Sequence, residues 1–144
     1  MAFTLTKEDI NGLSDDQLAA IFESLVTAVF ADGRADPVEI ERFEKEVEAV
    51  PWGKAAADVQ KIVQASKARV AKLANAQDVM TFIQAIAARL TKQDVREKVL
   101  RMMGSLMFSD KNFVNDEMNI LSAFSEVFQI PGARLDEIRL AASR

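Results

Sequence analysis

The 144-residue sequence contains no cysteine, no histidine and no tyrosine. Without cysteine the chain can form no disulfide, no thiolate nucleophile and no iron–sulfur cluster. Without histidine it has no imidazole general base and lacks the usual ligand set of zinc. The ligands that remain are carboxylates, amides, hydroxyls and backbone carbonyls, and these hard oxygen donors suit the divalent cations Ca²⁺, Mg²⁺ and Mn²⁺.

The sequence is also short of long apolar runs and of turn-forming residues. No apolar run approaches the ~20 residues that span a bilayer, and residues 1–8 lack the basic start and apolar centre of a secretion signal. We therefore expect a cytoplasmic protein with no direct membrane insertion. Five glycines and three prolines allow few tight turns, and a hydrophobic content of 49% is enough for one ordinary core. This length and composition predict a single domain over residues 1–144.

Helix caps and apolar residues at helical spacing predict an all-α bundle of seven or eight helices with no strand. The clearest start is the capping box of Ser14, in which Gln17 follows the cap by three positions. A second start has Asp36 as the cap and Pro37 at the first helical position. After a short first turn capped by Thr6, we expect helices from Ser14 to Asp32, from Asp36 to Val50, and over about 54–74 and 76–90. A further helix follows a cap at 91–94 and contains Val95 to Leu106, and the last two extend over about 115–129 and 131–142.

Charge is unevenly distributed along the chain, whose formal net charge is −4. Residues 1–50 carry a net charge of −8, residues 51–101 one of +6, and residues 102–144 one of −2. In one interpretation, charged helix faces attract each other across the fold. In the other, the surface is bipolar, and a basic face with Lys61, Lys67 and Lys72 docks an acidic partner. Overall acidity and the lack of aromatic residues among the basic ones argue against a nucleic-acid partner.

One acidic segment occurs twice in the chain. The segment from Phe30 to Glu39 returns in the second half, without a gap, as the segment from Phe108 to Glu117. This match predicts an internal two-fold repeat with halves of about 14–74 and 76–142. Val50-Pro51 and Ile130-Pro131 also correspond, but their separation is larger by two positions. A two-position shift therefore falls somewhere after Asp110, and the sequence leaves its place open.

Each copy places an Asp at a helix end, then a polar turn, then acids at the start of the next helix. Neither turn is an EF-hand, because position 3 counted from Asp32 is Arg34 and position 12 counted from Asp110 is Leu121. Helix capping alone explains Asp36 and Glu39, and by spacing it is the more common explanation. Asp32 and Asp110, in contrast, lie at helix C-termini, where the dipole disfavours an anion. This repeated departure from a local rule points to a role beyond stability, such as metal binding.

The two turns resemble the signature turns of the TerB family of tellurite-resistance proteins. The similarity rests on Asp32-Gly33 and on Ser109-Asp110-Lys111-Asn112-Phe113 with Asp116-Glu117, and it extends over about residues 14–140. The resemblance implies an all-helical, bacterial, cytoplasmic protein that is linked to resistance to tellurite and other stresses. It also implies that clustered acids bind a divalent metal. The implied ligands are Asp32, Glu39, Asp110 and Glu117 as principal ligands, with Asp36 and Asp116 as secondary ones.

The sequence departs from the family pattern in the second turn. Lys111 stands where the family usually has glycine, and Val114 and Asn115 stand where acids are common. We therefore expect one cation, held weakly. The resemblance further implies partners among other proteins of a resistance system, including a membrane protein, and a role by binding or assembly instead of catalysis. The sequence is compatible with a homodimer.

Two other functions remain open beside metal binding. The alternative is a metal-free interaction scaffold with segregated acidic and basic faces. An enzyme is the weakest hypothesis, because the sequence supplies no nucleophile, no cofactor loop and no phosphate cradle, and we expect no organic cofactor.

Overall fold

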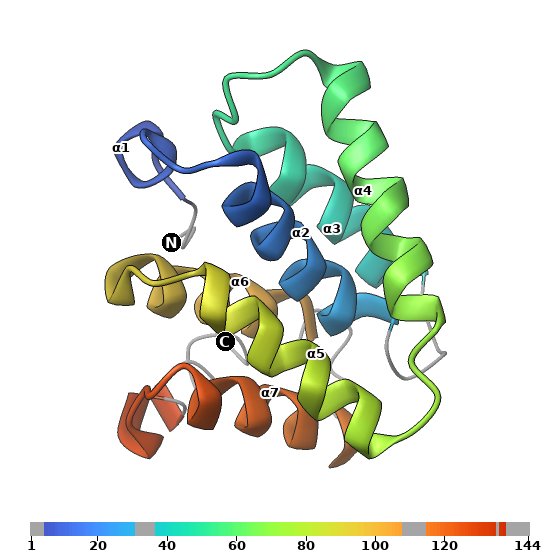
Figure 1. Ribbon diagram of the computed structural model, residues 1–144, viewed down its shortest axis with the longest axis vertical. Coiled ribbons are helices and arrows are strands. Elements are labelled where there is room, and N and C mark those ends of the chain that lie inside the picture. Colours follow the sequence, from blue (N-terminus) through green and yellow to red (C-terminus); the bar gives the residue numbers. More distant parts are fainter. Residues whose placement is uncertain (1–4, 31–36, 108–114, 135, 138–144) are drawn as a thin grey trace.

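The computed structural model describes residues 5–30, 37–107, 115–134 and 136–137. Within these ranges the chain is helical and contains no strand, which confirms the predicted all-α fold (Figure 1). The helices are α1 (Lys7–Ile10), α2 (Asp15–Phe30), α3 (Pro37–Ala49), α4 (Ala56–Ala71), α5 (Ala76–Arg89), α6 (Gln93–Met107) and α7 (Asn115–Val127). Residues 132–134 and 136–137 are also helical, within the last predicted helix. Among the described residues, none of the helices has the length and apolar character needed to traverse a bilayer.

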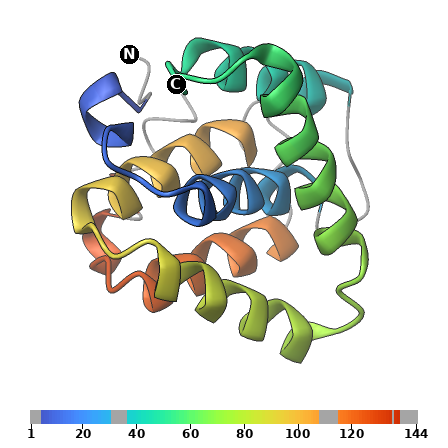
Figure 2. The ribbon, with the colours of Figure 1, turned by 45° about the horizontal axis from the view of Figure 1, so that its top comes forward.

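Helix α2 lies at the centre of the molecule. All ten side chains from Ala20 to Val29 are buried, and the most exposed of them, Ala28, is 5% exposed. Helices α3, α4, α5, α6 and α7 all pack against α2, and Figure 2 shows it in the middle of the others. A helix that is covered on every side must carry apolar side chains on every face, or polar side chains whose hydrogen-bonding groups are paired within the protein. The sequence predicts only one buried face for this helix, so its complete enclosure is a finding of the structure.

The polar side chains inside α2 satisfy themselves locally. Ser24 donates its hydroxyl hydrogen to the carbonyl oxygen of Ala20 at 2.9 Å, and Thr27 donates to that of Glu23 at 2.6 Å. Each hydroxyl thus bonds one helical turn back along its own helix. This local bonding lets two hydroxyl groups enter the core without leaving a donor unpaired.

The helix starts agree closely with the predicted caps, while two helix ends differ. The capping box at Ser14 is confirmed, because its N–H donates to Gln17 Oε1 at 2.9 Å and Gln17 N–H donates back to Ser14 Oγ at 3.2 Å. Helix α7 ends at Val127, before the predicted end at Gln129, because Gln129 takes a left-handed φ of 59° that closes the helix. Helix α4 spans Ala56–Ala71 and is shorter than the predicted 54–74 at both ends; it begins after Ala55, whose backbone is extended at φ −64° and ψ 148°.

Helices α6 and α7 follow α2 and α3 at a constant separation in sequence. The start of α6 follows the start of α2 by the same number of residues that separates Asp110 from Asp32. The start and the end of α7 follow those of α3 by this number too. In both views α2 and α6 run in the same direction, and α3 and α7 begin on the side where those two helices end (Figures 1 and 2). The two-position shift of the second proline therefore arises after α3 and α7. The internal repeat itself stays a prediction.

A buried carboxylate attaches the short helix α1 to α6. Thr6 caps α1, and its N–H and hydroxyl donate to Asp9 Oδ2 at 2.8 and 3.0 Å. Lys98 of α6 donates to the same oxygen at 2.7 Å, and the Asp9 side chain is 8% exposed. Burial alone would raise the pKa of Asp9, but the hydrogen bonds from Lys98 and Thr6 and the Lys98 charge outweigh it and hold this pKa below its ordinary 3.8.

The Asp9→Asn variant should therefore lose stability in a pH-dependent way. A lowered folded-state pKa means that the stabilisation is present above the unfolded pKa and disappears as the pH falls through the folded value. We expect a loss of about 1 kcal/mol at pH 7, given the part-exposed lysine. The difference from the wild type should shrink below pH 3.8 and vanish below the lowered folded-state pKa of Asp9. Urea unfolding between pH 7 and pH 2.5 measures this, with the exposed Glu44→Gln as control. An equal loss at every pH would contradict the role of the Asp9 charge.

Candidate functional site

The six predicted metal ligands lie outside or at the borders of the described ranges. Asp32, Asp36 and Asp110 lie outside the described residues. Glu39 is the third residue of α3, and Asp116 and Glu117 are the second and third residues of α7. The side chains of these three are also outside the described part. Their backbone positions fall in first helical turns, where the dipole stabilises carboxylates, as the capping interpretation requires.

The described part of the chain offers no competing metal site. Within residues 5–30, 37–107, 115–134 and 136–137, no group of three or more acidic side chains lies close enough to hold a metal ion. The two acidic turns therefore remain the candidate, and their joint coordination of one cation stays a prediction. The capping interpretation of Glu39, Asp116 and Glu117 also stays open.

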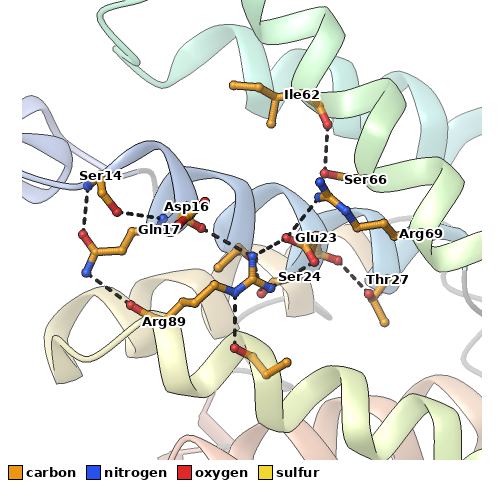
Figure 3. A network of polar contacts seen from close by, with 12 residues as sticks. Ser14, Asp16, Gln17, Glu23, Ser24, Thr27, Ile62, Ser66, Arg69 and Arg89 are labelled. Atoms are coloured by element: carbon orange, nitrogen blue, oxygen red, sulfur yellow. Dashed lines mark hydrogen bonds and ion pairs between the residues drawn. The ribbon is translucent and has the colours of Figure 1, made fainter.

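The structure adds a polar cluster that the sequence analysis missed, centred on Glu23. This carboxylate lies in the middle of α2 and is 2% exposed. Arg89, at the end of α5, donates hydrogen bonds to both carboxylate oxygens. Its Nη1 lies 2.7 Å from Oε2 and its Nη2 lies 3.0 Å from Oε1. Arg69 of α4 approaches Oε2 at 3.4 Å from the other side (Figure 3). One buried charge thus joins three helices that are distant in sequence.

The guanidinium of Arg89 is held by more than the carboxylate. Its Nε donates to the carbonyl oxygen of Ala85 at 3.2 Å, and Nη1 lies 3.5 Å from that of Asp16. Gln17, whose backbone N–H takes part in the capping box, donates its amide to the carbonyl oxygen of Arg89 at 3.2 Å. The cap of α2 and the end of α5 are therefore joined, as Figure 3 shows. A planar fork with five donors suits this multiple contact, whereas a lysine would not.

Sequence reasoning had one signal for this cluster and did not use it. Glu23 is the only charged residue between Asp16 and Phe30, within an otherwise apolar or neutral helix. A lone charge in such a helix must be paired if every face of the helix is buried. The partner could not be identified, because Arg89 lies 66 residues away.

Ion pairs join the acidic first segment of the chain to the basic second one. Lys54 pairs with Asp15 at 2.9 Å and Lys98 with Asp9 at 2.7 Å, in addition to the two arginines on Glu23. All four contacts link residues 1–50 with residues 51–101. They support the first interpretation of the charge pattern, in which oppositely charged segments attract each other across the fold. The charge available for a bipolar outer surface is correspondingly smaller.

The fold and its buried ion pair define a small all-helical protein built around one enclosed helix, with acidic turns between its central helices. A family model described as "Tellurite resistance protein TerB" matches residues 11–140. The chain therefore belongs to the TerB family, as the acidic turns predict. Comparisons with curated proteins and with solved structures find no match to this chain.

The two arginines on Glu23 should differ in their importance for stability. Replacing Arg89 by Met leaves a buried carboxylate with one weak partner, so we expect a loss of about 3–5 kcal/mol. Arg69 is 50% exposed and its contact is longer, so Arg69→Met should cost about 0–1 kcal/mol. Denaturant unfolding of both variants measures the difference.

A double variant separates the charge from the packing. Glu23→Met combined with Arg89→Met removes both charges. The double variant should therefore regain most of the stability that Arg89→Met alone loses. A double variant as unstable as Arg89→Met would show that the lost arginine packing, and not the orphaned carboxylate, causes the damage.

Proposed function

We propose that this TerB-family protein binds one divalent cation weakly through its two acidic turns and acts in tellurite or metal stress resistance by binding or assembly, without catalysis. The ligands are Asp32, Glu39, Asp110 and Glu117, supported by Asp36 and Asp116. The cation is Ca²⁺, Mg²⁺ or Mn²⁺, because the chain has only oxygen ligands to offer. Its setting is the bacterial cytoplasm, with other resistance proteins, one of them in the membrane, as partners.

The observation that carries the proposal is the arrangement of the four helices that border the acidic turns. Helices α2 and α6 pack against each other and run in the same direction. Helices α3 and α7 begin on the side where α2 and α6 end (Figures 1 and 2). Both acidic turns connect helix ends on that side of the molecule. Carboxylates that share a site repel one another, and a bound cation would relieve that repulsion.

Two features make the binding weak in this proposal. The first turns of α3 and α7 carry the partial positive charge of helix N-termini, which a cation does not favour. Lys111 adds a full positive charge within the second turn, where the family usually has glycine. Both positive contributions oppose the attraction of the carboxylates for a cation, so we expect weak affinity.

Isothermal titration calorimetry with Ca²⁺, Mg²⁺ and Mn²⁺ tests the proposal. The Asp32→Asn/Asp110→Asn variant should melt at a higher temperature than the wild type without metal, because it relieves repulsion between acids at unfavourable helix ends. It should show no heat of binding and no metal-induced rise in melting temperature. The control is Glu44→Gln/Glu48→Gln, which makes the same charge change on exposed residues of α3 and should bind as the wild type does. No heat and no melting shift in the wild type at millimolar metal would rule the site out.

The alternative function is a metal-free scaffold that docks other proteins through charged faces. α3 presents exposed Glu44 and Glu48 beside the ion pair of Glu41 with Lys45, α4 presents exposed Lys61, and exposed Lys72 follows the end of α4. If this is the function, capture of partner proteins from the same resistance system should depend on Lys61, Lys67 and Lys72. The Asp32→Asn/Asp110→Asn variant should then capture them as well as the wild type does. Loss of capture in that variant would favour the metal-dependent function.

A further inference from the structure

The sequence contains one Asn-Gly pair, Asn11-Gly12, and the structure places it in an open turn directly after α1. Both residues are exposed, and Figure 1 shows α1 at the edge of the molecule. A Cβ atom built on Gly12 would meet no atom within 4 Å. The turn precedes α2, whereas the first acidic turn follows the end of that helix of 16 residues, about 24 Å away. It is therefore separate from the proposed metal site.

An asparagine that is followed by glycine can lose its side-chain amide without an enzyme. The backbone nitrogen of the glycine loses its proton and attacks the side-chain carbonyl carbon of the asparagine, and a cyclic imide forms as ammonia leaves. Water then opens the ring at one of its two carbonyls, which gives aspartate or isoaspartate. The net reaction converts an amide and water into a carboxylic acid and ammonia, with no oxidation or reduction. Glycine favours the attack, because no Cβ obstructs its nitrogen and its backbone rotates freely.

The attacking nitrogen is available in this turn. The N–H of Asn11 donates to the carbonyl oxygen of Lys7 at 2.9 Å, and the N–H of Leu13 donates to that of Ile10 at 3.0 Å. Between them, the N–H of Gly12 donates no hydrogen bond to any residue that the structure describes. Its proton can therefore leave without the loss of a hydrogen bond.

The backbone of Asn11 slows the reaction without preventing it. Its ψ of 125° turns the Gly12 nitrogen away from the Asn11 side chain, so ring closure requires a rotation about the Cα–C bond of Asn11. That rotation moves an exposed turn, and segments of this kind open at low free energy. The unfolded chain has no such restraint, so the reaction should be faster there than in the folded protein.

Two other described asparagines lack this combination. Asn75 caps α5, and its side chain accepts a hydrogen bond from the N–H of Asp78 at 2.8 Å. Asn119 is exposed but lies inside α7, before the β-branched Ile120. In both cases ring closure would first have to break a cap or a helical turn. These two residues therefore serve as slow internal references.

We propose that Asn11 is a site of spontaneous deamidation in the folded protein, with the backbone nitrogen of Gly12 as the nucleophile. The product adds one negative charge to a chain of net charge −4, and isoaspartate also lengthens the backbone between α1 and α2 by one carbon. The new charge arises two residues from Asp9, whose ion pair with Lys98 at 2.7 Å attaches α1 to α6. This inference goes beyond the proposed metal function and does not depend on it.

Incubation of the folded, metal-free protein at pH 7 and pH 9, followed by peptide mass spectrometry, tests the proposal. In water enriched in heavy oxygen, the new carboxylate at position 11 should take up the label. Asn11 should convert at least about tenfold faster than Asn75 and Asn119, which corresponds to about 1.4 kcal/mol of activation free energy. Conversion should be faster at pH 9 than at pH 7, because base removes the amide proton. It should be faster still in urea.

Two matched glycine variants test the role of the nucleophile. Gly12→Ala should slow conversion of Asn11 at least about tenfold, because the added Cβ obstructs the attacking nitrogen. Gly53 also has a left-handed φ, of 74°, and no atom near its Cβ position. Gly53→Ala therefore imposes similar backbone strain away from the site and should leave the rate unchanged. Asn11→Gln retains Gly12 but requires a larger ring, so it should abolish labelling at position 11 and keeps the test valid if Gly12→Ala does not fold.

Three results would overturn the proposal. They are conversion of Asn11 no faster than that of Asn75 and Asn119 in the folded protein, no uptake of label at position 11, and equal rates in Gly12→Ala and Gly53→Ala. Because the protein is free of metal throughout, failure here would leave the metal titrations unaffected.

Discussion

The fold depends on one buried carboxylate, that of Glu23. It lies in α2, the helix against which α3, α4, α5, α6 and α7 all pack. Glu23 lies in the middle of α2, where it is 2% exposed, and an unpaired charge at that position would cost several kcal/mol. Arg89 makes the position tolerable by closing on both carboxylate oxygens. A buried ion pair adds little net stability but allows few alternative arrangements. It thereby fixes how α5 lies on α2, and Arg69 adds a weaker restraint from α4.

The same argument explains the segregation of charge along the chain. An acidic N-terminal third and a basic middle third would suit a bipolar surface if their charges pointed outward. Instead, Asp9, Asp15 and Glu23 take their partners from residues 51–101. Four basic residues of 51–101, namely Lys54, Arg69, Arg89 and Lys98, thus form ion pairs within the fold. Exposed charges on α3 and α4, such as Glu44, Glu48 and Lys61, remain available to a partner.

Local signals in the sequence predicted the helices well. The features that the sequence could not predict depend on contacts between residues far apart in the chain. The caps at Thr6 and Ser14 and the proline at the start of α3 appear where the chain chemistry requires them. Complete burial of α2 could not be read from its apolar stripe, because it depends on five other helices. The ion pair between Glu23 and Arg89 joins segments far apart in the chain. The repeated motif pointed to Asp32, Glu39, Asp110 and Glu117, and the TerB resemblance added Asp36 and Asp116, but the coordination of one cation by these residues remains a prediction.

The proposed cation site is also constrained by the helices that border it. Two C-termini, of α2 and α6, contribute about half a negative charge each, and two N-termini, of α3 and α7, about half a positive charge each. On the side of the molecule where these four ends lie, the helix dipoles therefore nearly cancel. Under the proposed function, the charged side chains of the two turns then decide whether a cation is attracted. Asp32 and Asp110 are the decisive pair, because the dipole gives a carboxylate no stabilisation at a C-terminus, so a cation is what would justify both.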